Sequence, residues 1–183
     1  MVIIYEPTRD PARLEEAAEL VQTVCRMTGY PNPDAWPDDS LKKDTLMRQE
    51  EAVCVWIAID TASDRVVGHG IAEPALANYW MNYPLTKPLW ASGVLTELGA
   101  LAVHPHYQRQ GIAKTLRRHR LAWMDEHGLV ACAVAWENGP SDFMCQTDPE
   151  FLRLGRRTAV IAQRPVIDYV RTTGLDLTST PIR

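Results

Sequence analysis

Long apolar runs are missing from this chain of 183 residues, although 46% of its residues are hydrophobic. No stretch approaches the roughly 20 consecutive apolar residues that a membrane-spanning helix requires. The first six residues, Met-Val-Ile-Ile-Tyr-Glu, also lack the basic start of a secretory signal peptide. We therefore expect no membrane partner and a cytoplasmic location.

Cysteine is scarce, and its spacing excludes the common metal motifs. The four cysteines form no C-x-x-C pair and no zinc-finger pattern, and His104-x-His106 has no third ligand at a useful spacing. Cys54 and Cys132 fall inside apolar, strand-like segments. We therefore predict buried free thiols and no metal site.

Two common phosphate-binding motifs are absent as well. The sequence contains neither G-x-x-x-x-G-K-[ST] nor a G-x-G-x-x-G followed by an acidic residue about 20 positions later. Internal repeats, low-complexity segments and linkers are also missing. The length lies well above the roughly 40 residues below which a domain usually needs disulfides, metal ions or oligomerisation to be stable. We therefore expect residues 1–183 to form a single domain, with a loose tail at 173–183.

Charge is distributed unevenly along the chain. Residues 1–103 include eight basic and 15 acidic residues, a net charge of −7. Residues 104–127 include five basic and two acidic residues, a net charge of +3. The acidic N-terminal half argues against broad binding of nucleic acid or anionic membranes. The local basic segment suits either a small polyanion or a solvated helix face.

The hydrophobic pattern predicts a mixture of strands and helices. The predicted strands are residues 2–8, 52–59, 65–73, 95–103, 129–136, 158–163 and 166–171. The predicted helices are residues 11–28, 40–50, 108–127 and a short one at 148–155, where Thr147 and Glu150 could form a capping box. This order is typical of an α/β or α+β domain with a single mixed sheet.

Residues 95–113, with the sequence LTELGALAVHPHYQRQGIA, are the most informative part of the chain. They read as an apolar strand, a proline turn, and a loop that has glycine at its fourth position and leads directly into a helix. At such a junction the unpaired backbone N–H groups and the positive end of the helix dipole point to one place. This arrangement predicts a site for a pyrophosphate group.

The hexapeptide at 108–113 resembles the Q/R-x-x-G-x-G/A signature of the GNAT superfamily of N-acetyltransferases, which bind acetyl-coenzyme A (acetyl-CoA). The order of predicted elements is similar to the GNAT fold over nearly the whole chain. The resemblance implies a mostly antiparallel central sheet flanked by helices, with acetyl-CoA as cosubstrate. It implies that the cosubstrate is bound by Leu101, Ala102, Val103, Gln108, Arg109, Gln110, Gly111, Ile112, Ala113, Lys114 and Asn138.

Glu97 is the catalytic candidate, because it lies six positions before Val103, where several GNAT members carry a glutamate that acts as general base. An attacking amine is an ammonium at neutral pH and must lose a proton before it attacks a thioester. A half-buried carboxylate could accept that proton, although a strand glutamate can also point to solvent or pair with an arginine. His104 and His106 are alternative bases that we expect to be ordinary turn residues. We expect His119, on the apolar stripe of its helix, to be a core residue.

The tyrosine that protonates the leaving thiolate in GNAT members has no counterpart here. In the family it follows the strand after the phosphate helix, in a pattern like N-x-x-A-x-x-F-Y. Counting from Asn138 places Cys145 at the tyrosine position, whereas counting back from the next glycine places Phe151 there. Tyr107 and Tyr169 remain open alternatives from elsewhere in the chain.

Two further features of the sequence lead to structural expectations. Residues 77–93 combine four aromatic residues with prolines, and we expect them either to fold back on the core or to line an acceptor pocket or partner surface. Gly99 and Ala100 interrupt the predicted strand 95–103 and could form a bulge that opens a slot for the pantetheine arm.

These observations predict an N-acetyltransferase that moves an acetyl group from acetyl-CoA to a primary amine, on a small molecule or a protein, by direct transfer in a ternary complex. A catalytically silent acyl-CoA-binding regulatory module with the same fold is the alternative, motivated by the missing tyrosine. The acidic N-terminal half disfavours a nucleic-acid partner. A homodimer through the aromatic loop or the last strands stays open, because no pattern in the sequence indicates it.

Overall fold

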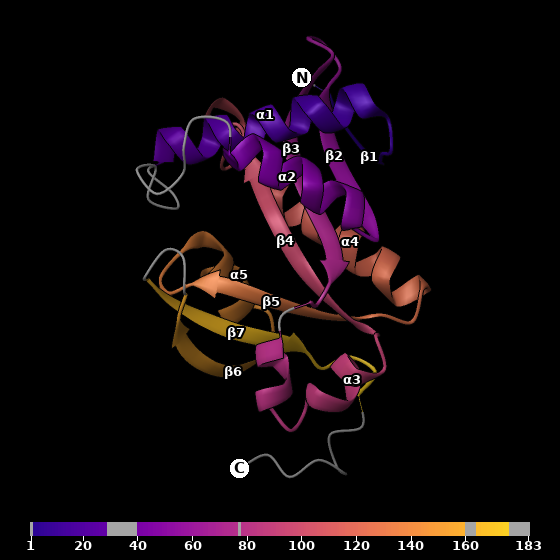
Figure 1. Cartoon of the computed structure of the whole chain (residues 1–183). Coiled ribbons are helices and arrows are strands. Elements are labelled where there is room, and N and C mark those ends of the chain that lie inside the picture. The colour runs from indigo at the N-terminus through magenta and orange to yellow at the C-terminus, as the bar shows by residue number, and fades with distance from the viewer. Residues whose placement is uncertain (1, 29–39, 77, 160–163, 176–183) are drawn as a thin grey trace. The chain divides into compact units, whose positions relative to one another are not determined.

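The computed structural model describes residues 2–28, 40–76, 78–159 and 164–175, and Figure 1 labels its helices and strands. The described strands are β1 (Ile3–Pro7), β2 (Cys54–Asp60), β3 (Arg65–Pro74), β4 (Leu95–Val103), β5 (Val130–Trp136), β6 (Phe151–Thr158) and β7 (Pro165–Arg171). The described helices are α1 (Pro11–Thr28), α2 (Ser40–Glu51), α3 (Lys87–Ala91), α4 (Ile112–Glu126) and α5 (Pro140–Gln146), with short 3-10 helices η2 (Asn78–Asn82) and η3 (Pro105–Tyr107). None of these helices is long and apolar enough to cross a membrane.

The strands of the described part of the chain form one seven-stranded sheet in the order β1-β2-β3-β4-β5-β7-β6. The pairs β1 and β2, β2 and β3, β5 and β7, and β6 and β7 run antiparallel. The pair β4 and β5 runs parallel. The predicted fold class, a mixed and mostly antiparallel sheet combined with helices, is therefore confirmed.

The chain divides into two compact units. The first contains Met1–Glu73 and Leu98–Trp123, and the second contains Pro74–Glu97 and Met124–Arg183. The strand β4 and the helix α4 each contribute residues to both units. Each unit has a hydrophobic core of its own.

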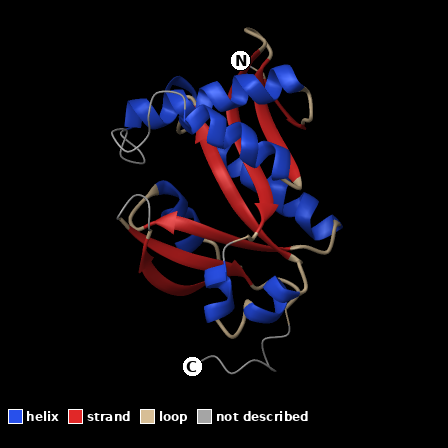
Figure 2. Ribbon diagram, viewed as in Figure 1, coloured by secondary structure: helices blue, strands red, loops and turns tan. Residues whose placement is uncertain are grey.

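In the first unit, α1 and α2 lie on one face of β2 and β3, and α4 lies on the other face (Figure 2). Successive strand residues point to opposite faces, so β2 supplies side chains to both sides. Ile57 belongs to a buried cluster with Leu20 of α1, whereas Ala58 belongs to a cluster with Ile112 and Leu116 of α4. The apolar stripe predicted for α4 therefore faces the sheet.

The ends of α1 and α4 follow the expected capping chemistry. Pro11 is the first residue of α1, and the N–H of Ala12 donates to Asp10 Oδ1 at 3.0 Å. Gly128 follows the end of α4 with a φ of 67°, in the left-handed region that favours glycine.

In the second unit, the proline-broken stretch after β3 folds onto the core. Trp80 is fully buried in a cluster with Leu95 of β4 and Cys132 of β5. The other three aromatic residues of the stretch pack against the same cluster. The stretch therefore packs on the core, which was one of the two expectations for it.

The short helix predicted at 148–155 is wrong, because the helix in this region is α5 and the predicted segment leads into β6. Thr147 ends α5 rather than starting a helix, since its hydroxyl donates to the Phe143 carbonyl oxygen at 2.9 Å. Pairing with β7 gives β6 an antiparallel ladder that is interrupted at the register shift between Arg153 and Gly155, and this pairing outweighs a local capping preference. Most of the predicted strand 158–163 and of the predicted tail lies outside the described residues.

His69 is a fully buried histidine in the middle of β3. Its Nδ1 lies 2.9 Å from the Ala100 carbonyl oxygen, and its Nε2 lies 3.1 Å from the side-chain nitrogen of Gln49. Burial lowers the pKa of His69 to about 3, despite the hydrogen bond to Ala100. The ring is therefore neutral in the folded protein at neutral and mildly acidic pH.

Acidification is expected to destabilise the protein through His69. The unfolded chain binds a proton there below about pH 6.5, whereas the folded chain does so only near pH 3, so stability is lost as the pH falls between these values. Between pH 7 and pH 5 this group should lower the free energy of unfolding by about 2 kcal/mol. Urea unfolding at both pH values would measure the effect. In His69→Asn, most of the difference in unfolding free energy between pH 7 and pH 5 should disappear. An equal pH dependence of stability in the variant and the wild type would contradict the prediction.

Candidate functional site

The loop before α4 has a backbone conformation that excludes a regular helix. Arg109 and Gly111 have φ values of 62° and 81°, both in the left-handed region. The helix α4 therefore begins at Ile112, four residues later than its sequence pattern predicted, and residues 108–111 form an exposed loop. This later start corrects the predicted helix bounds and leaves the N–H groups of Arg109, Gln110 and Gly111 outside the α4 ladder, whereas the Gln108 N–H donates to the Pro105 carbonyl oxygen at 3.3 Å.

The first turn of α4 presents backbone donors. The N–H of Thr115 donates to the Gly111 carbonyl oxygen at 2.9 Å, which is the first hydrogen bond of the helical ladder. The N–H groups of Ile112, Ala113 and Lys114 precede that bond and have no acceptor within the helix. Together with the helix dipole, they form an arrangement that favours an anion.

Side chains hold this loop against the rest of the first unit. The Gln108 side-chain amide donates to the Val103 carbonyl oxygen at 3.0 Å, and that of Gln110 donates to a carbonyl of the preceding turn at 3.2 Å. Tyr107 donates its hydroxyl to Asp60 Oδ2 at 2.7 Å, which ties η3 to the end of β2. Side chains therefore hold the loop to the strand and turn that precede it, while its backbone stays exposed.

The basic residues of this segment divide into two sets. Arg109, Lys114 and Arg118 are exposed, whereas Arg117 and Arg120 of α4 are buried. The segment is therefore not a uniformly solvated basic face. Exposed cations beside the first turn of α4 add to the attraction for an anion there.

The strand β4 is distorted at Gly99 and Ala100, where the sequence predicted an interruption. Ala100 has a φ of 40°, a conformation that costs a non-glycine residue about 1–3 kcal/mol. Among the described residues, the ladder between β4 and β5 covers Leu95–Glu97 and does not reach residues 101–103. Beyond the distortion, Leu101 is half-buried, and Ala102 and Val103 are buried.

Glu97 lies in the second unit and is half-buried in β4. Tyr79 of η2 donates its hydroxyl to Glu97 Oε2 at 3.2 Å. Burial, followed by the charge of Glu97, raises the pKa of Tyr79, so the phenol keeps its proton and remains a donor. Sequence reasoning missed this partner, which lies 18 positions away in the aromatic stretch.

Arg157 of β6 links Tyr79 to a buried carboxylate. Its guanidinium lies 3.7 Å from the centre of the Tyr79 ring, and its Nε lies 2.9 Å from Asp168 Oδ2. Tyr83 donates to the same carboxylate oxygen at 2.7 Å. Burial and the bond to Asp168 raise the pKa of Tyr83 to about 12. The buried charge of Asp168 is thus balanced, and η2 is fixed to β6 and β7 beside Glu97.

The comparison with protein families identifies this combination of elements. Residues 17–144 match the model of the acetyltransferase (GNAT) family. The chain belongs to the GNAT acetyltransferase family. The matched region includes β4, the loop at 108–111 and α4. In a sequence search, no curated protein matches the chain.

Solved structures with the GNAT fold resemble the chain over most of its length. A GNAT acetyltransferase from Desulfovibrio desulfuricans is 17% identical with a TM-score of 0.65, covering 92% of this chain and 98% of its own. The ribosomal-protein-S18-alanine N-acetyltransferase of Escherichia coli is 14% identical with a TM-score of 0.65, covering 93% of each chain. A GNAT acetyltransferase from Brucella melitensis in complex with acetyl-CoA is 18% identical with a TM-score of 0.58, covering 91% of this chain and 86% of its own. At these identities the likeness shows the fold alone.

Asn138, which the resemblance implied as a cosubstrate ligand, and three of the residues considered in place of the GNAT tyrosine lie in the second unit. Asn138 lies in an exposed turn after β5, and its N–H donates to Asp142 Oδ2 at 2.8 Å. Tyr169 donates to Asp142 Oδ1 at 2.5 Å. Burial opposes ionisation of Asp142, but these hydrogen bonds outweigh it and lower the pKa of Asp142. Cys145 is buried in α5, and Phe151 is buried at the start of β6.

The histidines near the GNAT loop contact neighbouring groups of the protein. His104 Nδ1 accepts a hydrogen bond from the His106 N–H at 3.3 Å, within the turn of η3. His119 of α4 stacks on Trp56 of β2, with ring centres 4.6 Å apart. Among the described residues, no three His, Cys, Asp or Glu side chains gather as a metal ion would require.

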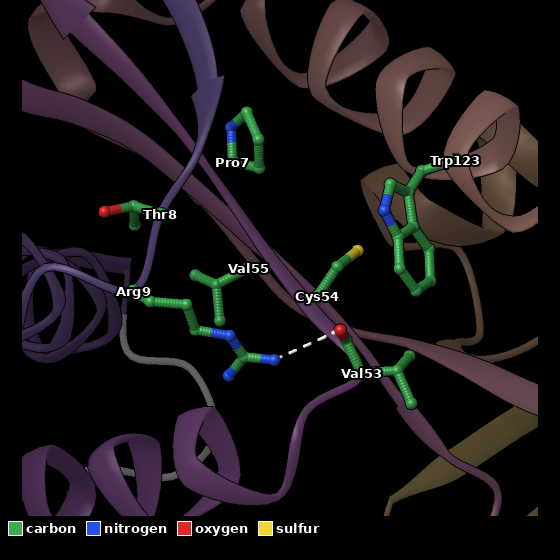
Figure 3. A pocket seen from close by; sticks show the side chains of 7 residues that line it. All are labelled: Pro7, Thr8, Arg9, Val53, Cys54, Val55 and Trp123. Atoms are coloured by element: carbon green, nitrogen blue, oxygen red, sulfur yellow. Dashed lines mark hydrogen bonds between the residues drawn. The ribbon is translucent and has the colours of Figure 1, made fainter.

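A cavity of about 270 Å³ lies in the first unit, between the end of β1, the start of β2 and α4 (Figure 3). The Cys54 thiol points toward Trp123 across it. Burial raises the pKa of Cys54 to about 11, so this thiol is a poor nucleophile at neutral pH. The cavity is lined by none of the site residues that the GNAT resemblance implied.

Proposed function

We propose that the protein is an N-acetyltransferase that moves the acetyl group of acetyl-CoA to a primary amine of a small molecule or protein. The observation that carries this proposal is the junction of β4 and α4, where a distorted strand, a loop with left-handed Gly111 and the first turn of a helix follow one another. Membership of the GNAT acetyltransferase family supports the same function.

The residues at the junction fit a diphosphate. A Cβ placed on Gly111 would meet no protein atom within 4 Å, so the space in front of the loop is open. In this proposal the backbone at 108–113 holds the diphosphate, Arg109 and Lys114 balance its charge, and the backbone at 101–103 binds the pantetheine arm. Glycine is required where the main chain comes closest to the diphosphate, because a side chain there would hold the donating N–H groups away from the phosphate oxygens.

Glu97 serves as the general base in this proposal, and Asn138 contributes a further contact to the cosubstrate. The thioester supplies an activated acetyl carbon. Glu97 takes a proton from the ammonium, directly or through water, so that the neutral amine can attack the acetyl carbon and form the new N–C bond. The second proton on nitrogen is lost to solvent as the tetrahedral intermediate collapses. A backbone N–H within 101–103 stabilises the negative charge on the carbonyl oxygen, and the C–S bonding electrons leave with sulfur. A coenzyme A thiolate has a low enough pKa to leave without a dedicated acid.

Turnover with a panel of amines tests this function. Purified protein is mixed with acetyl-CoA and each amine, and release of the coenzyme A thiol is followed with a thiol reagent. We expect acetyl-CoA to bind and at least one class of primary amine to be acetylated. Tight binding without turnover of any amine would instead favour the catalytically silent acyl-CoA-binding module.

Cys145→Ala is expected to retain turnover within about threefold, because direct transfer in a ternary complex needs no acetyl-cysteine intermediate. Cys145 is 3% exposed, so its thiol has little access to a thioester. Intact-mass analysis after incubation with acetyl-CoA alone provides the second measurement. Loss of turnover in the variant, together with an acetyl adduct on wild-type Cys145, would contradict direct transfer.

A further inference from the structure

Two successive carbonyl groups at the distortion of β4 are hydrogen-bonded from opposite faces of the first unit. The Gly99 carbonyl oxygen accepts from Arg120 Nη1 of α4 at 3.1 Å. The Ala100 carbonyl oxygen accepts from His69 Nδ1 of β3 at 2.9 Å. A carbonyl can only accept, so His69 carries its proton on Nδ1, and Nε2 accepts from the Gln49 side-chain amide at 3.1 Å.

These two bonds fix the orientation of the next N–H groups along β4. A peptide unit is planar and trans, so its C=O and N–H point in opposite directions. The hydrogen bond that His69 donates to the Ala100 carbonyl therefore sets the direction of the Leu101 N–H. The hydrogen bond that Arg120 donates to the Gly99 carbonyl sets the direction of the Ala100 N–H in the same way. Hydrogen bonding to the carbonyl also polarises the peptide unit, which strengthens its N–H as a donor.

Arg120 is an unusual residue to find in this position. Its side chain is 1% exposed, and the hydrogen bonds found for it among the described residues all go to backbone carbonyls, those of Leu116, Ile71 and Gly99. Burial lowers its pKa only to about 10, so it remains a cation at neutral pH. A buried cation satisfied by carbonyl groups favours negative charge nearby.

The neighbouring strand leaves room for this guanidinium. A Cβ on Gly70 would lie 2.9 Å from Arg120 Cζ and 3.0 Å from its Nε. Any side chain at position 70 would therefore displace Arg120 from the Gly99 carbonyl. The left-handed φ of Ala100 needs such support, because strained backbone persists only where its surroundings hold it.

We propose that His69 and Arg120 are positioning residues that lock the Gly99–Ala100 distortion, so that the Leu101 N–H is oriented and polarised toward the thioester carbonyl oxygen. The inference rests on the proposed function, in which a backbone N–H of residues 101–103 stabilises that oxygen. His69 acts through the peptide unit that contains the Leu101 N–H. Arg120 acts through the preceding peptide group, which joins Gly99 to Ala100, and adds its positive charge. Neither side chain needs to touch the substrate.

The carbonyl stretch of bound, carbonyl-¹³C-labelled acetyl-CoA tests this proposal in the absence of any amine. In wild type we expect the infrared band to lie below its frequency in solution, as for a hydrogen-bonded carbonyl. His69→Leu removes the donor and Gly70→Ala displaces Arg120, so both variants should return the band toward the solution value. His69→Asn keeps a donor near the Nδ1 position and should retain the shift.

Affinity and turnover separate positioning from general damage. Coenzyme A without an acetyl group should bind the variants within about threefold of wild type, whereas kcat should fall about 10- to 100-fold in His69→Leu and Gly70→Ala. His127→Leu, which replaces an exposed histidine just after the end of α4, should change neither quantity. Should His69→Leu fail to fold by circular dichroism, Gly70→Ala provides the same readout.

The outcomes distinguish this inference from the function on which it rests. Wild-type protein that binds no acetyl-CoA would overturn the proposed function and the inference with it. Wild-type protein that binds acetyl-CoA, with the same carbonyl band in wild type, His69→Leu and Gly70→Ala, would overturn the inference alone. A band that shifts in both variants and is restored in His69→Asn would support it.

Discussion

Gly111→Glu is expected to lower the affinity for acetyl-CoA by more than about 100-fold, which corresponds to about 3 kcal/mol. Gly111 has a φ of 81°, so any side chain there strains the loop even though the space around it is open. The new carboxylate would also lie in front of the amides that are proposed to bind the diphosphate, where it repels that group. Isothermal titration with acetyl-CoA measures the loss.

Gly128→Glu provides the matched control for that substitution. Gly128 has a φ of 67° and equally open surroundings, but it follows the C-terminal end of α4. The control therefore reproduces the backbone strain and the added charge away from the proposed binding loop. We expect its affinity for acetyl-CoA to stay within about threefold of wild type. Equal affinities of the two variants and wild type would show that the loop does not bind the cosubstrate.

Glu97→Gln is expected to lower kcat by about 10²- to 10⁴-fold, the range that a general base contributes, with little change in KM for acetyl-CoA. The amide is close in shape to the carboxylate but cannot take a proton from the attacking ammonium. Raising the pH should restore part of the rate, because a larger fraction of the amine is then already deprotonated. Initial rates over a pH series, with the best amine of the panel, provide the measurement.

Two companion variants make the Glu97 result specific. Tyr79→Phe removes the phenol that donates to Glu97, so the acid limb of the pH–rate profile should move to higher pH. Glu15→Gln, at a surface ion pair with Lys42, removes a carboxylate elsewhere and should leave kcat unchanged. A Glu97→Gln enzyme with wild-type kcat at every pH would exclude Glu97 as the base.

The elements nearest the proposed site could be predicted from the sequence because their signals are local. The bounds of β4 follow from a mostly apolar segment between a glycine and a proline turn, and they match the structure. The positive φ of Gly111 agrees with glycine at the close-approach position of the loop. The pattern placed the start of α4 too early, since apolar spacing does not report that Arg109 is left-handed as well.

Contacts between distant segments could not be predicted in the same way. Tyr79 and Glu97 belong to different elements, and nothing in their spacing indicates that a phenol and a carboxylate meet. Thr147 and Glu150 match a capping box, which favours a helix start, but the pairing of β6 with β7 outweighs this local preference. The burial of Arg120 could not be predicted for the same reason, because its guanidinium meets Gly70 only in the folded protein.

A crystal structure of the protein with acetyl-CoA tests the proposed phosphate loop most directly. We expect the diphosphate oxygens to lie within hydrogen-bonding distance, about 2.7–3.2 Å, of backbone nitrogens between Gln108 and Ala113. We also expect the acetyl carbonyl oxygen to meet a backbone N–H between Leu101 and Val103. A diphosphate bound elsewhere on the chain, with those nitrogens left to water, would contradict the assignment of this loop and of the transferase activity built on it.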